Sequence, residues 1–134
     1  RIEGRLQRNY DVVGEGQEYK FQLYTRQNTR PGMDDDFSCG LSWLAPNGET
    51  LTLCRYNGPH LDHFNRVEHE WLEAKCHIHR TTERYIQAGF KPEGHASTTD
   101  RYRTLTGALH CLVTDCRISG LETQPDEPTL FPLP

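Results

Sequence analysis

The sequence predicts an α+β fold, in which an antiparallel β-meander in the N-terminal half packs against a C-terminal helix. Three observations lead to this fold class. Stretches of alternating apolar and polar residues fill the first half of the chain, and turn-forming residues separate them. A long apolar repeat at three-to-four-residue spacing occurs only near the C-terminus. Strands followed by helices in a chain of 134 residues are typical of a single α+β domain. We expect this domain at residues 1–120 and a proline-rich C-terminal tail at residues 121–134.

The strands are predicted from alternation with a period of two residues. Residues 19–26 (YKFQLYTR) and residues 37–44 (FSCGLSWL) both alternate, as half-buried strands do. An Asn-Gly pair, a strong hairpin signal, follows the second segment, so residues 50–56 are expected to return as its partner. An earlier strand is expected at residues 5–13. Such a meander has one face on the core and leaves the other face, or an edge, free for function.

The segment after the meander is harder to assign. Residues 61–74 (LDHFNRVEHEWLEA) fit a loop or a short helix, and residues 75–79 (KCHIH) fit a short strand. A short helix is expected near residues 81–88, because Thr81 is a suitable N-cap and Gly89 is a suitable residue at its C-terminal end.

The longest helix is expected at residues 100–117. Tyr102, Leu105 and Leu109 recur there at helical spacing, and Thr98 or Thr99 precedes them as a candidate N-cap. This helix would cover the apolar face of the meander.

Composition limits the classes of function. The net charge of −4 argues against a generally basic nucleic-acid-binding protein. No apolar run approaches the length of a membrane span and no signal peptide is visible, so a cytoplasmic protein without a membrane partner is expected. The five cysteines show no Cys-x-x-Cys pair. They are expected to be reduced, buried hydrophobic residues rather than disulfides or a zinc site.

Histidines cluster in the segment that follows the meander. Five of the seven, His60, His63, His69, His77 and His79, lie within twenty residues. Cleavage of RNA through its 2′-hydroxyl needs a base, an acid and cations that hold the phosphate. Histidine suits both proton roles, and the arginine fork suits the phosphate.

The sequence therefore predicts a metal-independent ribonuclease that needs no cofactor. Its expected catalytic residues are His60, His63, Arg66, His77, His79 and Arg80. Its expected substrate-binding residues are Asn57, Arg84 and Tyr85. Either Tyr85 or Tyr56 would be the surface on which a base stacks.

A metal centre is an alternative reading of the same histidines. On a strand, His77 and His79 point to one face, so both imidazoles can reach one ion with His60, His63 or Glu83 as a further ligand. Residues 77–89 resemble the first motif of the cupin family, in which Glu and Gly follow His-x-His. A metal-dependent hydrolase or a cupin-like metal binder is therefore an alternative function.

Two short segments suggest another enzyme family. "HRT" at residues 79–81 and "HAS" at residues 95–97 resemble the paired His-x-Thr/Ser signature of two-histidine phosphoesterases. That family sets its two units on two lobes with a long chain between them, whereas only thirteen residues separate the two segments here.

A broader resemblance covers most of residues 19–118. The segments FQLYTRQN, DFSCGL, RYNGPH, HIHRTTERYIQAGF and TDRYRTLTGALHCLVTDC together resemble an uncharacterised bacterial small-domain family. RYNGPH (residues 55–60) and HIH (residues 77–79) are also similar to segments of TumE-type toxins of toxin–antitoxin pairs. This resemblance implies a small cytoplasmic toxin-like or mobile-element-associated protein that acts on RNA, with an antitoxin as a candidate partner.

A non-enzymatic function is the remaining alternative. The acidic stretch MDDDF at residues 33–37 and the proline-rich tail favour a binding or regulatory module of a toxin–antitoxin or defence complex. Its protein partner would dock on an exposed edge of the sheet.

Overall fold

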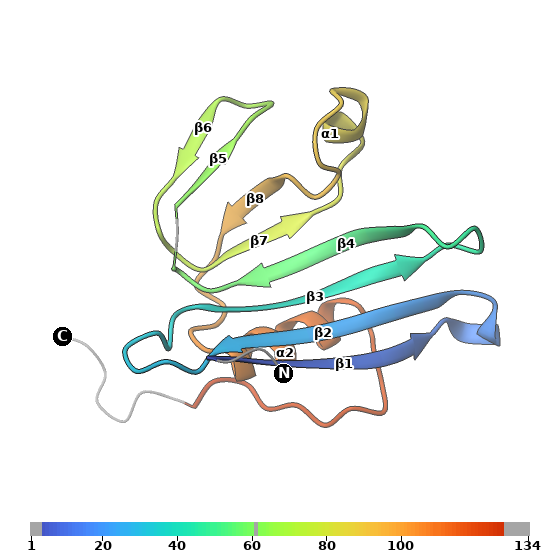
Figure 1. The fold of residues 1–134 in the computed structure, drawn as a ribbon, viewed down its shortest axis with the longest axis horizontal. Helices are drawn as coiled ribbons and strands as arrows, with labels where there is room; N and C mark the ends of the chain where they lie inside the picture. The colour runs from blue at the N-terminus through green and yellow to red at the C-terminus, as the bar shows by residue number, and fades with distance from the viewer. Residues whose placement is uncertain (1–3, 61, 128–134) are drawn as a thin grey trace.

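The protein is built on a six-stranded antiparallel sheet with the strand order β1-β2-β3-β4-β7-β8 (Figure 1). The structure is a computed structural model that describes residues 4–60 and 62–127. The six strands are β1 (Arg5–Val13), β2 (Lys20–Asn28), β3 (Phe37–Leu44), β4 (Thr50–Asn57), β7 (His77–Arg80) and β8 (His95–Thr98). A separate hairpin of β5 (His63–Asn65) and β6 (Glu70–Leu72) lies between β4 and β7 in the chain. The fold is mostly antiparallel sheet with few helices, which is compatible with the predicted α+β class.

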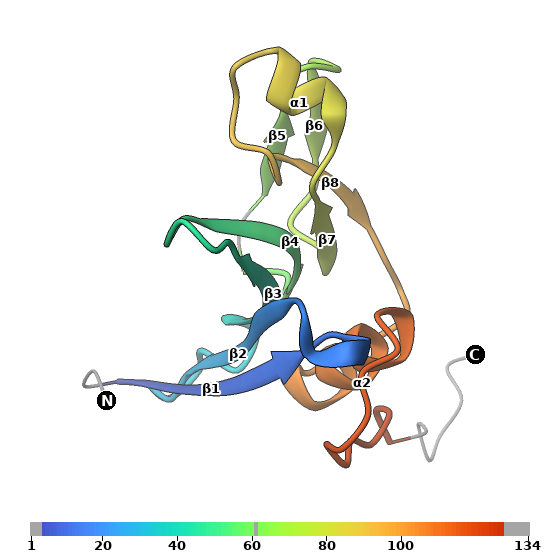
Figure 2. The same ribbon diagram turned by 90° about the vertical axis from the view of Figure 1, so that its right-hand side faces the viewer.

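Three short helical elements complete the described part of the chain. They are the 3₁₀ turn η1 (Glu15–Gln17), α1 (Glu83–Gln87) and α2 (Leu105–Asp115). Figure 2 shows α2 beside β1 and β2 at one end of the molecule, and α1 with the β5–β6 hairpin at the other. Neither α1 nor α2 is long and apolar enough to cross a membrane.

The core lies between α2 and one face of β2, β3 and β4. Because side chains alternate along a strand, Leu23, Cys39 and Tyr56 all reach this face and are buried there. Ala108 and Leu112 of α2 pack against them, since helix positions four apart share a face. The alternation that predicted the meander is thus the pattern that forms its core.

The predicted start of the long helix is wrong. The helix begins at Leu105, and Thr104 is its N-cap, accepting a hydrogen bond from the backbone N–H of Gly107 at 3.2 Å. Thr98 instead ends β8. Tyr102 lies before the helix, where its buried hydroxyl contacts the carbonyl oxygens of Asn57 and His77 at 2.8 and 3.1 Å. Residues 99–104 are needed to connect the sheet to the helix.

The short helix is present, but its N-cap lies one residue later than predicted. Thr82 is the N-cap of α1, accepting from the backbone N–H of Tyr85 at 3.3 Å. Thr81 is not available for this role because its hydroxyl donates to the carbonyl of Thr52 in β4. Gly89 follows the helix with a φ of 77°, a conformation that glycine adopts without strain.

The prediction of a loop or short helix at residues 61–74 is also wrong, because residues 63–72 form the β5–β6 hairpin; residue 61 lies outside the described residues. Phe64 and Trp71 are opposite one another, with ring centroids 4.9 Å apart. His69 takes a positive φ of 54° in the turn. The strands are only three residues long, which is too short for alternation to be visible in the sequence.

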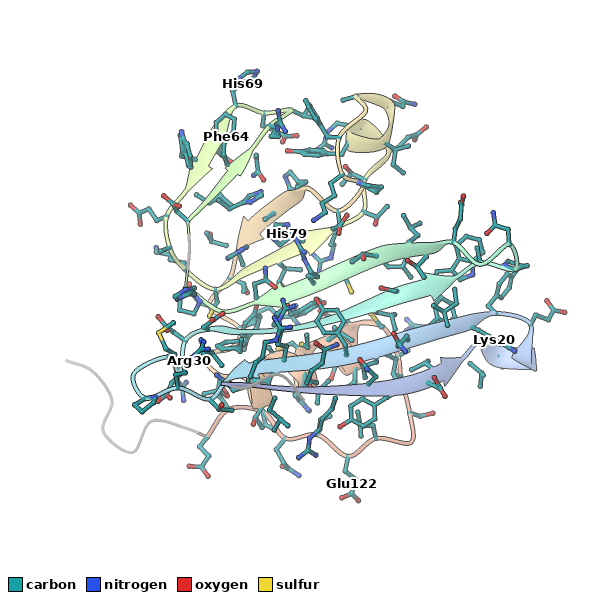
Figure 3. All side chains as sticks on the ribbon, viewed as in Figure 1. Lys20, Arg30, Phe64, His69, His79 and Glu122 are labelled. Carbon is teal, nitrogen blue, oxygen red and sulfur yellow. The ribbon has the colours of Figure 1, made fainter. Side chains whose placement is uncertain are left out.

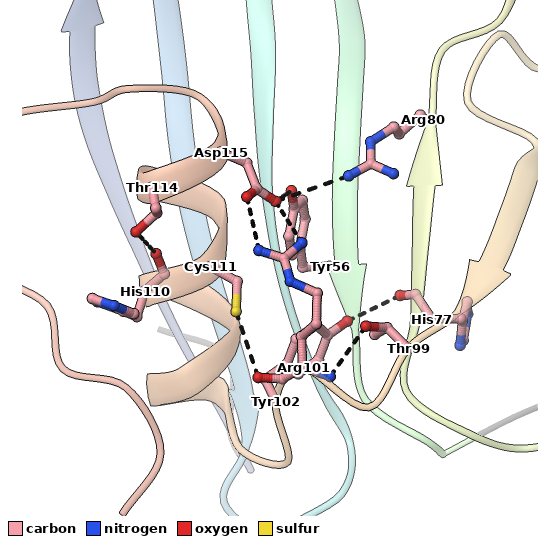
Figure 4. Close-up of polar contacts among 10 residues, drawn as sticks. All are labelled: Tyr56, His77, Arg80, Thr99, Arg101, Tyr102, His110, Cys111, Thr114 and Asp115. Carbon is pink, nitrogen blue, oxygen red and sulfur yellow. Dashed lines mark hydrogen bonds and ion pairs between the residues drawn. The ribbon is translucent and has the colours of Figure 1, made fainter.

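A polar network joins the end of α2 to the sheet (Figure 4). Arg101 donates two hydrogen bonds to the carboxylate of Asp115, at 2.8 and 2.9 Å, and lowers its pKa. The buried hydroxyl of Tyr56 donates to the same carboxylate. Arg80 of β7 lies 3.9 Å from it. Asp115 therefore links the helix to β4 and β7 at once.

The cysteines are mostly buried and form no disulfide. All five thiols are free; four are buried as predicted, whereas Cys116, at the C-cap of α2, is exposed.

The described part of the tail contacts the start of α2, since the carboxylate of Asp126 accepts from the backbone N–H of Arg103 and the hydroxyl of Thr104. Residues 128–134 of the predicted tail lie outside the described residues.

Candidate functional site

The face of the sheet opposite α2 carries a polar hollow of about 390 Å³. Strand residues Arg26, Ser38, Arg55, Asn57, His77 and His79 line it, and the segments around them add further polar groups. These strand residues alternate with the core residues of the same strands. The meander therefore forms its core on one face and this hollow on the other.

The strand register aligns these side chains in two rows. Ser38 is opposite Asn57, and Asn57 is opposite His77, so the first row crosses β3, β4 and β7. In the second row, Arg55 is directly opposite His79. Antiparallel partners hold their Cβ atoms about 5 Å apart, so the residues of each row are neighbours. Ser38 donates a hydrogen bond of 2.7 Å to the side-chain oxygen of Asn57 and fixes its orientation.

A glycine at the β3 position of the second row makes room for the side chain of Tyr24. Gly40 lies opposite Arg55 on β3, and a Cβ atom there would come within 2.6 Å of the Tyr24 ring. The ring of Tyr24 thus lies over Gly40 and fills the space that a side chain at this position of β3 would take. Its hydroxyl lies 3.2 Å from Ser38 Oγ, which connects it to the first row.

Three imidazoles meet in the hollow. The ring centroid of His79 lies 4.7 Å from that of His63 and 5.0 Å from that of His77, and those of His63 and His77 are 6.0 Å apart. Figure 3 shows His79 on β7 below the hairpin that carries Phe64 and His69. His63 comes from this hairpin, so the trio combines two segments of the chain.

Each of the three rings donates one hydrogen bond to a backbone carbonyl. His63 donates through Nε2 to Gly94 at 2.8 Å, His77 through Nδ1 to Lys75 at 2.8 Å, and His79 through Nδ1 to Glu93 at 2.9 Å. A carbonyl oxygen only accepts, so these nitrogens carry the protons. The other nitrogen of an uncharged imidazole has a lone pair, which can accept a proton or bind another ligand.

Burial keeps two of the rings neutral. The His79 side chain is 3% exposed, and desolvation together with the charge of Arg55 lowers the pKa of this imidazole to about 3. Desolvation also lowers the pKa of His77. At neutral pH both rings are therefore uncharged. In a proton transfer, each can accept a proton but has no second proton to give.

Cations surround the histidines. Arg26, Arg55 and Lys91 line the hollow, with Asp36 and Asp62 as its carboxylates. The Nε–H of Arg55 is buried and has no hydrogen-bond partner among the described residues. A buried donor of this kind normally has a partner, and leaving it unpaired costs free energy.

Five of the nine predicted site residues line this one hollow. They are Asn57, His60, His63, His77 and His79. His60 lies at the exposed rim, with its Nδ1 4.0 Å from the carboxylate of Asp35. The hollow thus brings these five residues together, whereas His69 of the same segment lies in the hairpin turn and does not line it.

The other four predicted residues lie elsewhere. Arg80 follows His79 in β7, so alternation places it on the α2 face beside Asp115. Arg84 donates to Glu68 at 2.8 Å, and the buried Tyr85 donates to the same carboxylate at 2.7 Å. The guanidinium of Arg66 lies 4.5 Å above the ring of Phe90. None of the four lines the histidine hollow.

Sequence reasoning missed several residues that line the hollow, among them Arg26, Ser38, Arg55 and Lys91. Arg55 was visible in principle, because alternation places it on the face opposite Cys54 and Tyr56. Arg26 and Ser38 depend on the register of β2, β3 and β4, which no local pattern reveals. Lys91 comes from the loop between α1 and β8.

The two motif resemblances are not matched by the arrangement of their residues. The cupin motif needs one strand through Glu83, but β7 ends at Arg80 and Glu83 begins α1. His95, the second histidine of the phosphoesterase signature, contacts Tyr85 at a centroid distance of 6.0 Å and does not line the hollow. Within residues 4–60 and 62–127, no group of three or more His, Cys, Asp or Glu side chains is arranged to hold a metal ion.

Comparisons with family models, curated proteins and solved structures give no match for this chain. The resemblance to TumE-type toxins stays a prediction.

The buried Asn65 positions His63. Its side chain, 0% exposed, donates to the carbonyl of Ala96 and accepts from the N–H of Ala96, both at 2.8 Å. These two bonds attach the β5–β6 hairpin to β8. They imitate a strand pairing that the backbone itself does not make.

Replacing Asn65 with alanine is expected to loosen the hairpin. Both backbone groups of Ala96 lose their partner, so we expect a loss of about 1–3 kcal/mol in the free energy of unfolding. Amide hydrogen exchange should also accelerate in β5 and β6. The exposed Asn9→Ala in β1 is the control, and equal effects of the two substitutions on exchange in the hairpin would contradict this role for Asn65.

Proposed function

We propose that this chain is a toxin-like, metal-independent ribonuclease whose site is the histidine hollow. The observation that carries the proposal is the convergence of four predicted histidines on one hollow lined by three cationic side chains. Histidines supply the proton transfers of RNA cleavage, and cations stabilise the charge on the phosphate.

The reaction requires two proton transfers. A neutral imidazole, His77 or His79, accepts the proton of the 2′-hydroxyl through its free Nε2. The 2′-oxygen then attacks phosphorus, and the bond from phosphorus to the 5′-oxygen breaks. A protonated imidazole gives its proton to that leaving oxygen. We assign this second role to His60, which lines the rim of the same hollow with its Nδ1 4.0 Å from the carboxylate of Asp35.

Binding of the phosphate would activate the bases. Arg55 lies opposite His79 and its positive charge contributes to the low pKa of that ring. A phosphate paired with Arg55 offsets this charge and raises the pKa of the neighbouring imidazoles. The histidines would then accept protons more readily once a substrate is bound.

The test is cleavage of RNA in the presence of EDTA. We expect the protein to cut single-stranded RNA and His77→Ala/His79→Ala to be slower by a factor of about 10²–10⁴. His69→Asn is the matched control, because His69 lies in the exposed turn of the hairpin, outside the hollow.

Two results would contradict the proposal. If the protein and the double variant both leave RNA uncut, the protein is not a ribonuclease. If cleavage appears only with added divalent metal and EDTA abolishes it, the metal-dependent alternative replaces the metal-independent mechanism.

A further inference from the structure

A second hollow adjoins the histidine hollow. It has a volume of about 330 Å³ and lies between the β5–β6 hairpin and the segment after α1. His63, Lys91 and Gly94 line both hollows, so the two meet along this boundary. A ligand that fills both would pass His63.

The second hollow differs in chemistry from the first. Phe64 and Phe90, both half-buried, and the ring of Tyr85 form its walls. The guanidinium of Arg66 lies 4.5 Å over the ring of Phe90. Flat aromatic and guanidinium surfaces are those on which nucleic-acid bases stack.

The first hollow provides a place for an anion beside it. The Nε–H of Arg55 is buried and unpartnered among the described residues, and Arg26 and Lys91 add positive charge. A phosphate oxygen would accept from that donor, and arginine binds phosphate through charge-assisted hydrogen bonds. An anion in the first hollow thus lies next to a stacking surface in the second.

We propose that the two hollows together bind one nucleotide, with its phosphate against Arg55 and its base in the aromatic hollow beside Phe90. The ribose would then lie at His63, near His77 and His79, where its 2′-hydroxyl meets the proposed bases. The nucleotide would be part of the RNA substrate, and this role rests on the proposed ribonuclease function. It implies that the RNA is bound with one base unstacked.

The test is binding of adenosine 3′-monophosphate, inorganic phosphate and adenosine, measured by isothermal titration calorimetry. We expect the nucleotide to bind at least about tenfold more tightly than phosphate, because stacking of the base adds to the phosphate contacts. Phe90→Leu keeps an apolar side chain but removes the aromatic ring, so it should abolish this advantage and leave the affinity for phosphate unchanged. Arg55→Gln should weaken the binding of both nucleotide and phosphate.

Tyr19→Leu is the control, since Tyr19 is 55% exposed and lies far along the chain, before β2. Equal affinities for nucleotide and phosphate, or no effect of Phe90→Leu, would overturn the inference. Preferential nucleotide binding without RNA cleavage supports the nucleotide site while refuting the ribonuclease. Cleavage without any preference for the nucleotide refutes only the base hollow.

Discussion

Lowering the pH from 7 to 4 is expected to reduce the free energy of unfolding by about 3 kcal/mol through His79 alone. In the folded protein the pKa of this imidazole is about 3, whereas its ordinary value is 6.5. The unfolded chain therefore binds more protons than the folded chain between these two values. Stability is complete above pH 6.5 and is lost as the pH falls toward 3, at about 1.4 kcal/mol per pH unit.

A difference between two variants isolates this effect from the other titrating groups. Asp115 also has a lowered pKa and destabilises the protein in the same direction at acid pH. His79→Asn removes the titrating ring while its amide can replace the bond from Nδ1 to the Glu93 carbonyl. Urea unfolding at pH 7 and pH 4 should show a smaller loss of stability in His79→Asn than in the parent protein. The same substitution at the exposed His69 should leave the loss unchanged. An identical pH dependence of the parent protein and His79→Asn would show that His79 is not buried as a neutral ring.

The burial of His79 beside Arg55 costs the fold free energy, and this cost indicates that the two residues serve a function. His79 is buried beside Arg55, a cation that disfavours its protonation, and the Nε–H of Arg55 has no hydrogen-bond partner in the part of the chain that the structure describes. Neither feature stabilises the fold. Titratable groups with strongly shifted pKa values in a concave site are typical of functional sites. A core built for stability alone would place apolar side chains on β7 at these positions.

The sequence predicts this site in part because alternation encodes the two faces of a strand. It shows that His77 and His79 share a face, and Arg80 follows by the same rule on the other face, beside Asp115. The prediction that Arg80 belongs with the histidines neglected that rule. Arg84 and Tyr85 were assigned from their proximity in the chain, but Glu68 of the β5–β6 turn binds both of them.

The parts of the fold and of the site that the sequence does not predict depend on contacts between segments far apart in the chain. The two rows across β3, β4 and β7 follow from strand register, and no short-range signal fixes how β4 pairs with β7 across the nineteen residues between them. The start of α2 was placed too early because Tyr102 continues the helical spacing of apolar residues. Its hydroxyl instead contacts carbonyl oxygens of β4 and β7, a tertiary contact that outweighs local propensity.

Replacing Leu112 with alanine is expected to reduce the free energy of unfolding by about 2–5 kcal/mol, because it leaves a cavity at the centre of the core. Leu112 is 0% exposed and lies on the face of α2 that contacts β2, β3 and β4. These strands carry Arg26, Ser38 and Arg55 on their other face, so the helix supports the hollow through the sheet. A loss of this size is a large part of the stability of a small domain.

Leu109→Ala is the matched control, since Leu109 lies one turn earlier in α2 and is only half-buried. Urea denaturation should give it a smaller loss than Leu112→Ala, because water already reaches part of its side chain. At a temperature where Leu112→Ala remains folded, its RNA cleavage should match that of the parent protein, since no atom of the hollow has changed. Equal losses of stability in the two variants would contradict the assigned position of Leu112 at the centre of the core.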